Sequence, residues 1–128
     1  MSAYAAAAPQ AYRDQSVLTA PPEQLVLMLY DGARRFLHQG AVTMREGDLE
    51  RCNDRLQKAE AIIDELLNTL DMSAGQIAEN LQSLYFYFKR ELLQARLQRQ
   101  PEKIEQVSSL LGEIRDGWAQ MTPPPQTP

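Results

Sequence analysis

The side chains most able to do chemistry in this sequence are its single histidine, His38, and its single cysteine, Cys52. Nucleophilic catalysis needs a base beside a nucleophile, and no distinctive serine or cysteine context accompanies His38. A di-iron helical bundle would carry Glu-x-x-His pairs, but Arg35 lies three residues before His38 and no second histidine exists. The sequence therefore predicts no metal site, no cofactor and no enzymatic activity.

One reaction stays open as an alternative, because helical phosphotransfer modules expose a single histidine on a helix. His38 lies within a helical pattern, but it is followed by Gln39, Gly40 and Ala41, and no lysine lies nearby to hold a phosphoryl group. An ordinary surface histidine is the expectation, with phosphotransfer through His38 kept as the alternative function.

The distribution of charge argues against other classes of function. The formal net charge is -4, whereas a general nucleic-acid binder needs concentrated positive charge. One local run of basic residues consists of Lys89, Arg90, Arg96, Arg99 and Lys103. Since Glu91 and Glu102 are interspersed among them, we interpret this run as a solvated helix face. The carboxylates are spread along helix faces, and nothing groups them into a catalytic pair.

Length and composition indicate one domain in a reducing compartment. The chain has 128 residues, of which 44% are hydrophobic and 23% charged, as in ordinary soluble globular domains. A lone Cys52 excludes an intrachain disulfide, which suits the cytoplasm. No basic segment of a signal peptide opens the chain, and the longest strongly apolar run, Leu25 to Tyr30, is too short to cross a membrane. We expect a cytoplasmic protein without membrane insertion.

Four helical patterns occupy residues 21–121. The first begins at Pro21-Pro22 and runs to about Met44, and the second starts after Asp48, a good N-cap. The apolar stripe of the second is Leu49, Cys52, Leu56, Ala59, Ile63, Leu66 and Leu70. The apolar stripe of the third pattern is Ile77, Leu81, Leu84, Phe88, Leu92 and Ala95. The fourth pattern begins at Pro101, and its apolar stripe is Ile104, Val107, Leu111, Ile114, Trp118 and Met121.

These patterns predict an all-α fold, an antiparallel four-helix bundle over residues 21–121. Residues 1–20 are Ala-rich with few large apolar groups, so we expect a flexible, loosely attached N-terminal segment. Residues 122–128 are Pro-rich and uncharged, which indicates a disordered tail.

Two runs break the one-sided pattern. Leu25 to Tyr30 is six apolar residues in succession, and Leu84 to Phe88 is five, so each run wraps the whole circumference of its helix. The side chains that the core cannot take must face a partner helix, a second copy of the chain or the N-terminal segment. Candidate partner-binding residues are Tyr12, Val17, Leu25, Met28, Leu29, Tyr30, Tyr85, Tyr87 and Phe88. Tyr12 and Val17 are expected to act as a displaceable lid over this surface or as part of it.

An ordered set of short motifs resembles the flagellin export chaperone family, FliS. Its opening signature is matched by Tyr12, Val17, Thr19-Ala20, Pro22, Leu25 and Met28-Leu29-Tyr30-Asp31-Gly32. Later matches are Asn53, Leu56, Ala59, Ile62-Ile63, Glu65-Leu66, Leu70-Asp71, Ile77-Ala78, Asn80-Leu81, Leu84-Tyr85, Tyr87, Leu111, Ile114-Arg115 and Trp118. One departure is Pro21, where the family commonly has a serine or threonine that caps the first helix.

The resemblance implies both a fold and a function. Proteins of this family are antiparallel helical bundles that bind the disordered C-terminal part of flagellin in the cytoplasm. They keep flagellin from polymerising early and help deliver it to the flagellar type III export apparatus. The resemblance thus implies a chaperone with flagellin and the export apparatus as partners. A structural or weak homodimer through the same apolar surface remains the other alternative.

Overall fold

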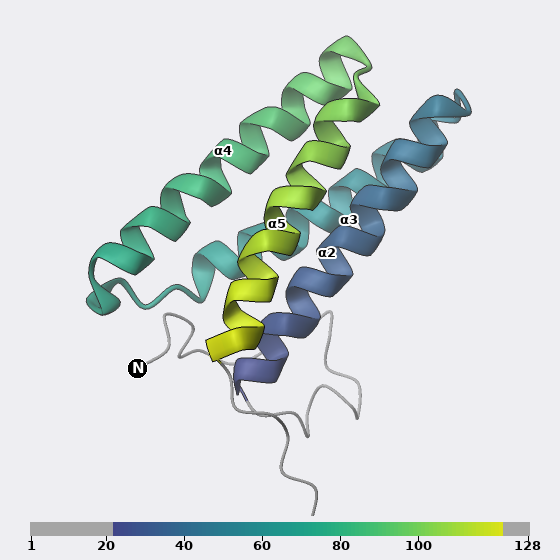
Figure 1. Ribbon diagram of the computed structural model, residues 1–128. Helices are drawn as coiled ribbons and strands as arrows, with labels where there is room; N and C mark the ends of the chain where they lie inside the picture. Colours follow the sequence, from purple (N-terminus) through teal and green to yellow (C-terminus); the bar gives the residue numbers. More distant parts are fainter. Residues whose placement is uncertain (1–21, 122–128) are drawn as a thin grey trace, which may run out of the picture.

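The computed structural model describes residues 22–121, which form four consecutive α-helices (Figure 1). They are α2 (Pro22–Arg45), α3 (Leu49–Asn68), α4 (Gln76–Gln98) and α5 (Pro101–Met121), and a short 3-10 turn, η2 (Met72–Ala74), precedes α4. Successive helices run in opposite directions, as short connections require. The predicted all-α four-helix bundle is confirmed. The predicted flexible segment, residues 1–20, and the predicted disordered tail, residues 122–128, lie outside the described residues.

The helix ends follow from local chemistry. Gly47 adopts a left-handed φ of 77° between α2 and α3, a conformation that costs glycine little. Asp48 then caps α3, because its carboxylate accepts a hydrogen bond from the backbone N–H of Arg51 at 3.1 Å. At the same end of the bundle, Arg99 closes α4 in the left-handed region and Pro101 begins α5.

Replacing Asp48 with alanine should lower the free energy of unfolding by about 0.5–2 kcal/mol, because the first turn of α3 loses a hydrogen-bond acceptor. Urea denaturation checks this value. Asp54→Ala on the exposed face of the same helix is the control, since it removes an equal charge without touching a cap. Equal losses for the two variants would show that charge, and not capping, accounts for the effect.

One hydrophobic core runs between the helices. α2 packs along α3 on one side and along α5 on the other, and α4 closes the bundle against α5 and α3. The largest fully buried side chains are Tyr30, Tyr85, Phe88, Leu37, Leu56, Ile62, Ile63, Leu66, Leu92, Ile104, Leu111 and Val107. Each helix therefore contributes to a common core, with α2 in the most extensive contact.

Of the predicted α4 stripe, Leu81, Phe88, Leu92 and Ala95 are buried, and the other two positions are displaced by one residue. Ile77 and Leu84 are exposed, and their neighbours Ala78 and Tyr85 are buried instead. A shift of one residue rotates a side chain by about 100° around a helix. The buried positions of α4 are spaced three and four residues apart from Ala78 onward, so the predicted heptad pattern is kept and only its first and third members move by one residue.

The other predicted stripes need smaller corrections. In α3 the stripe holds from Cys52 to Leu66, with Ile62 added to it, while Leu49 is exposed and Leu70 lies beyond the helix. In α5 the buried members are Ile104, Val107 and Leu111. Ile114 and Trp118 pack against the core but keep part of their surface, because the helices spread apart toward the end of α5. The side chain of Met121 is outside the described set.

Candidate functional site

Four of the predicted partner-binding residues belong to the core. Leu29, Tyr30, Tyr85 and Phe88 are all buried. The hydroxyls of Tyr30 and Tyr85 share a hydrogen bond between α2 and α4, and burial raises the pKa of both phenols well above the usual range. These four side chains face other helices, so they are not part of the surface that a partner meets in this conformation.

The rest of the predicted set lies nearer the surface. Leu25 and Met28 on α2 and Tyr87 on α4 are partly exposed. The Tyr87 hydroxyl donates to Glu91 Oε1 at 2.9 Å, and Lys103 Nζ of α5 lies 3.3 Å from the other oxygen of that carboxylate. The hydrogen bond raises the pKa of Tyr87 and lowers that of Glu91. Tyr87 therefore helps to join α4 to α5. Tyr12 and Val17 lie outside the described residues.

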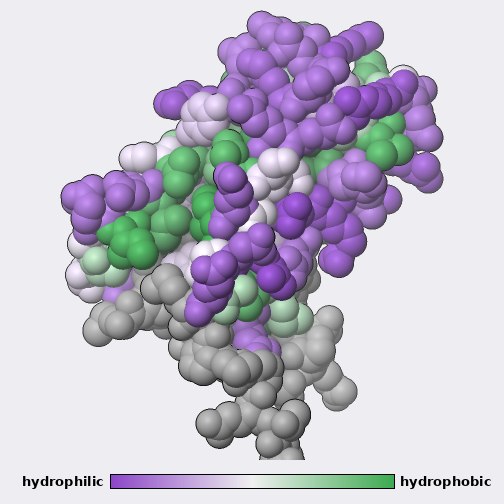
Figure 2. Space-filling view, viewed as in Figure 1, coloured by the Kyte–Doolittle hydropathy of each residue, from purple (hydrophilic) through white to green (hydrophobic). Residues whose placement is uncertain are grey.

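The exposed apolar surface is concentrated on α4. Its large apolar side chains in contact with solvent are Ile77, Leu84, Phe86, Leu93 and Leu97. Figure 2 shows apolar side chains over α4 and between α4 and α5, on a surface that is otherwise mostly hydrophilic. The sequence interpretation missed Leu93 and Leu97, because each stands outside the core stripe. Leu93 and Leu97 follow Phe86 by seven and eleven residues, a spacing that places all three side chains on one face of a helix. This spacing could have identified them as part of an exposed apolar face.

A groove of about 510 Å³ lies along the α3 side of this surface. Its lining residues are Glu60, Phe86, Lys89, Arg90, Leu93 and Arg96. Two ion pairs form its edge, with Lys89 Nζ at 2.5 Å from Asp64 Oδ1 and an Arg96 nitrogen at 3.1 Å from Glu60 Oε2. Burial raises the pKa of Glu60, while the Arg96 charge opposes that shift. The groove thus combines apolar side chains with a partly neutralised cationic border.

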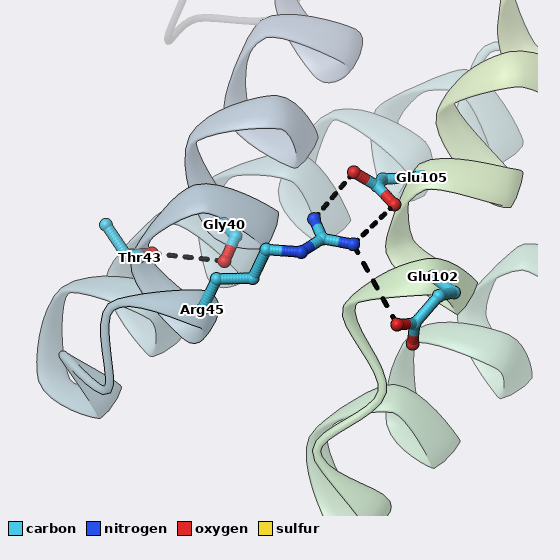
Figure 3. Close-up of polar contacts among 5 residues, drawn as sticks. All are labelled: Gly40, Thr43, Arg45, Glu102 and Glu105. Atoms are coloured by element: carbon cyan, nitrogen blue, oxygen red, sulfur yellow. Dashed lines mark hydrogen bonds and ion pairs between the residues drawn. The ribbon is translucent and has the colours of Figure 1, made fainter.

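Residues of the Met28–Gly32 signature have structural roles. Asp31 accepts hydrogen bonds from the Arg115 guanidinium at 3.0 and 3.3 Å, which joins α2 to α5. At the opposite end of the same helix pair, Arg45 makes bonds of 2.6 and 2.9 Å to the carboxylate of Glu105 (Figure 3). Two bidentate arginine–carboxylate pairs therefore set the alignment of these helices, because a planar guanidinium fits a carboxylate in one geometry. Thr43, also drawn in Figure 3, donates its hydroxyl proton within α2, to the carbonyl of Gly40 at 3.1 Å.

The residues considered for chemistry are not assembled into a reactive centre. His38 is exposed beside a shallow groove of about 430 Å³ between α2 and α3. Cys52 is buried, and burial raises the pKa of its thiol, which disfavours the reactive thiolate. Over residues 22–121, no three His, Cys, Asp or Glu side chains gather as metal ligands. Within the same part of the chain, no helix combines the length and the apolar character that crossing a membrane requires.

Comparison with known proteins gives one consistent result. The family model described as flagellar protein FliS matches residues 4–125. The flagellar secretion chaperone FliS of Salmonella typhimurium is 40% identical over 112 residues, covering 86% of this chain and 83% of that protein. The chaperones of the same name from Bacillus subtilis and Vibrio cholerae are 36% and 34% identical, over 86% and 89% of this chain and 82% and 88% of theirs.

Proposed function

Because the chain belongs to the FliS family of flagellar proteins, we propose that it is a cytoplasmic export chaperone for flagellin. It binds the disordered C-terminal segment of flagellin, prevents flagellin from polymerising early, and aids its delivery to the flagellar type III export apparatus. The work is done by binding alone, without a catalysed reaction.

The observation that carries this proposal is the excess of apolar surface on α4. Isolated apolar side chains are normal on a protein surface, but several large ones on one helix mark an interaction site. A disordered segment that folds on binding lays the apolar face of a helix into such a surface. The partly exposed Leu25, Met28 and Tyr87 are proposed as further contacts, since they adjoin the core without being enclosed by it.

Isothermal titration calorimetry with the C-terminal segment of the cognate flagellin tests the proposal. We expect about one segment to bind each chain, with a clearly negative heat-capacity change, because coupled folding buries on the order of 1,000–3,000 Å². A scrambled segment of the same composition is the control and should not bind. No binding of the native segment at tens of micromolar would overturn the proposal.

One variant separates this function from the phosphotransfer alternative. His38→Ala should bind the flagellin segment as tightly as the unchanged protein, since His38 lies in an open groove between α2 and α3 that shares no residue with the groove on α4. Motility in cells carrying His38→Ala should also be unchanged. Loss of motility regulation with intact flagellin binding would favour phosphotransfer instead.

A further inference from the structure

The outer face of α4 carries a row of three apolar side chains, Phe86, Leu93 and Leu97, bordered by cations. We propose that this row seats one helix of the flagellin segment, with carboxylates of that helix lying against Arg90. The inference rests on the proposed function and specifies where, and by what chemistry, the partner is held.

The row has the geometry of a helix-binding face. Spacings of seven and eleven residues place Leu93 and Leu97 within about 20° of Phe86 around the helix. Their exposed fractions are 49% for Phe86, 52% for Leu93 and 71% for Leu97, so none is needed to complete the core. At 1.5 Å per residue the row extends about 16 Å. A partner helix of three turns, with apolar residues three and four positions apart, matches this length.

The border of the row has an excess of positive charge. Lys89 and Arg96 on the α3 side are neutralised by Asp64 and Glu60. Arg90, which lines the same groove, is exposed and makes no salt bridge among residues 22–121; its nearest acidic neighbour in sequence, Glu91, is already bonded by Tyr87 and Lys103. The whole chain has a net charge of -4, so this local excess runs against the overall balance. Acidic side chains beside the apolar stripe of a partner complement it.

Charge also disfavours two other occupants of the row. In a twofold homodimer the same patch meets itself, which would bring the two Arg90 borders together. The terminal segments of this chain are the second alternative, and they lack the acidic residues that would complement Arg90. Residues 1–21 contain one acidic residue, Asp14, beside Arg13, and residues 122–128 contain none. A separate chain with an acidic amphipathic helix fits the face better than either.

Calorimetry on surface variants with the same flagellin segment tests this placement. The double variant Leu93→Ser, Leu97→Ser should weaken binding at least about tenfold, as expected for a central apolar contact. Arg90→Glu should weaken binding several-fold and reduce its dependence on salt concentration. Matched controls are Val42→Ser and Arg51→Glu, which change an exposed valine and an exposed arginine of α2 and α3, and these should bind like the unchanged protein.

The outcomes separate this placement from the function itself. Suppose that the unchanged protein binds the segment and that the Leu93, Leu97 double variant binds it equally well. The α4 row is then not the binding site, and the proposed chaperone function is unaffected. If the unchanged protein does not bind the flagellin segment, the proposed chaperone function is itself overturned. Light scattering covers the remaining case: a dimer that the double variant converts to monomers, with flagellin affinity unchanged, would assign the row to self-association and overturn the proposal.

Discussion

Phe88→Ala should lower the free energy of unfolding by about 3–5 kcal/mol, while Phe86→Ala, two residues earlier on α4, should change it by no more than about 1 kcal/mol. Phe88 is 0% exposed and packs against Tyr85 and Tyr87 in the core, with ring centroids 6.3 and 6.0 Å apart. Phe86 points outward with about half of its surface in water. Truncating the buried ring leaves a cavity that close-packed neighbours fill poorly.

Urea denaturation of the two variants, with the dependence on denaturant checked for each, measures this difference. The pair is matched in residue type, helix and distance from the helix ends, so the comparison isolates burial. In flagellin binding the order should reverse, with Phe86→Ala weakened and folded Phe88→Ala less affected. Equal destabilisation by both substitutions would show that the face of α4 turned toward the core has been misassigned.

Leu56→Ala should cost about 2–5 kcal/mol of stability, and Gly40→Ala should recover part of that loss. Leu56 is fully buried where α3 meets α2. A Cβ built on Gly40 would lie 2.7 Å from Leu56 Cδ2 and 3.2 Å from its Cγ. In the unchanged protein, this overlap offsets the gain in helix propensity, about 1 kcal/mol, that alanine has over glycine. Once Leu56 is shortened, the added methyl group enters vacated space.

A double-mutant cycle measures this coupling. Gly40→Ala should stabilise the Leu56→Ala protein by about 1 kcal/mol more than it stabilises the unchanged protein. Gly117→Ala in α5 is the control, because a Cβ there meets nothing within 4 Å, and its effect should be the same in both backgrounds. Additive behaviour of Gly40→Ala and Leu56→Ala would contradict the close approach of α2 and α3 at this point.

Much of the candidate surface was not predictable, for a reason visible in α4. A run such as Leu84 to Phe88 contains apolar residues at every angle around the helix, so periodicity does not say which of them are enclosed. Tyr30 and Tyr85, which the sequence suggested as partner-binding residues, lie inside the bundle, where their hydroxyls bond to each other. Burial of a tyrosine is tolerated when its hydroxyl is bonded, and that bond joins residues 55 positions apart.

The sequence by itself determined the four helices, their approximate ends and the family likeness. These depend on neighbours within a few residues: Asp48 caps the turn that follows it, Pro101 begins a helix, and apolar spacing marks a buried face. Only the tertiary structure decided that Asp31 pairs with Arg115, that Tyr85 rather than Leu84 enters the core, and that Leu93 and Leu97 remain outside. Those outcomes depend on which helix lies opposite and at what rotation, and such contacts arise between residues far apart in the chain.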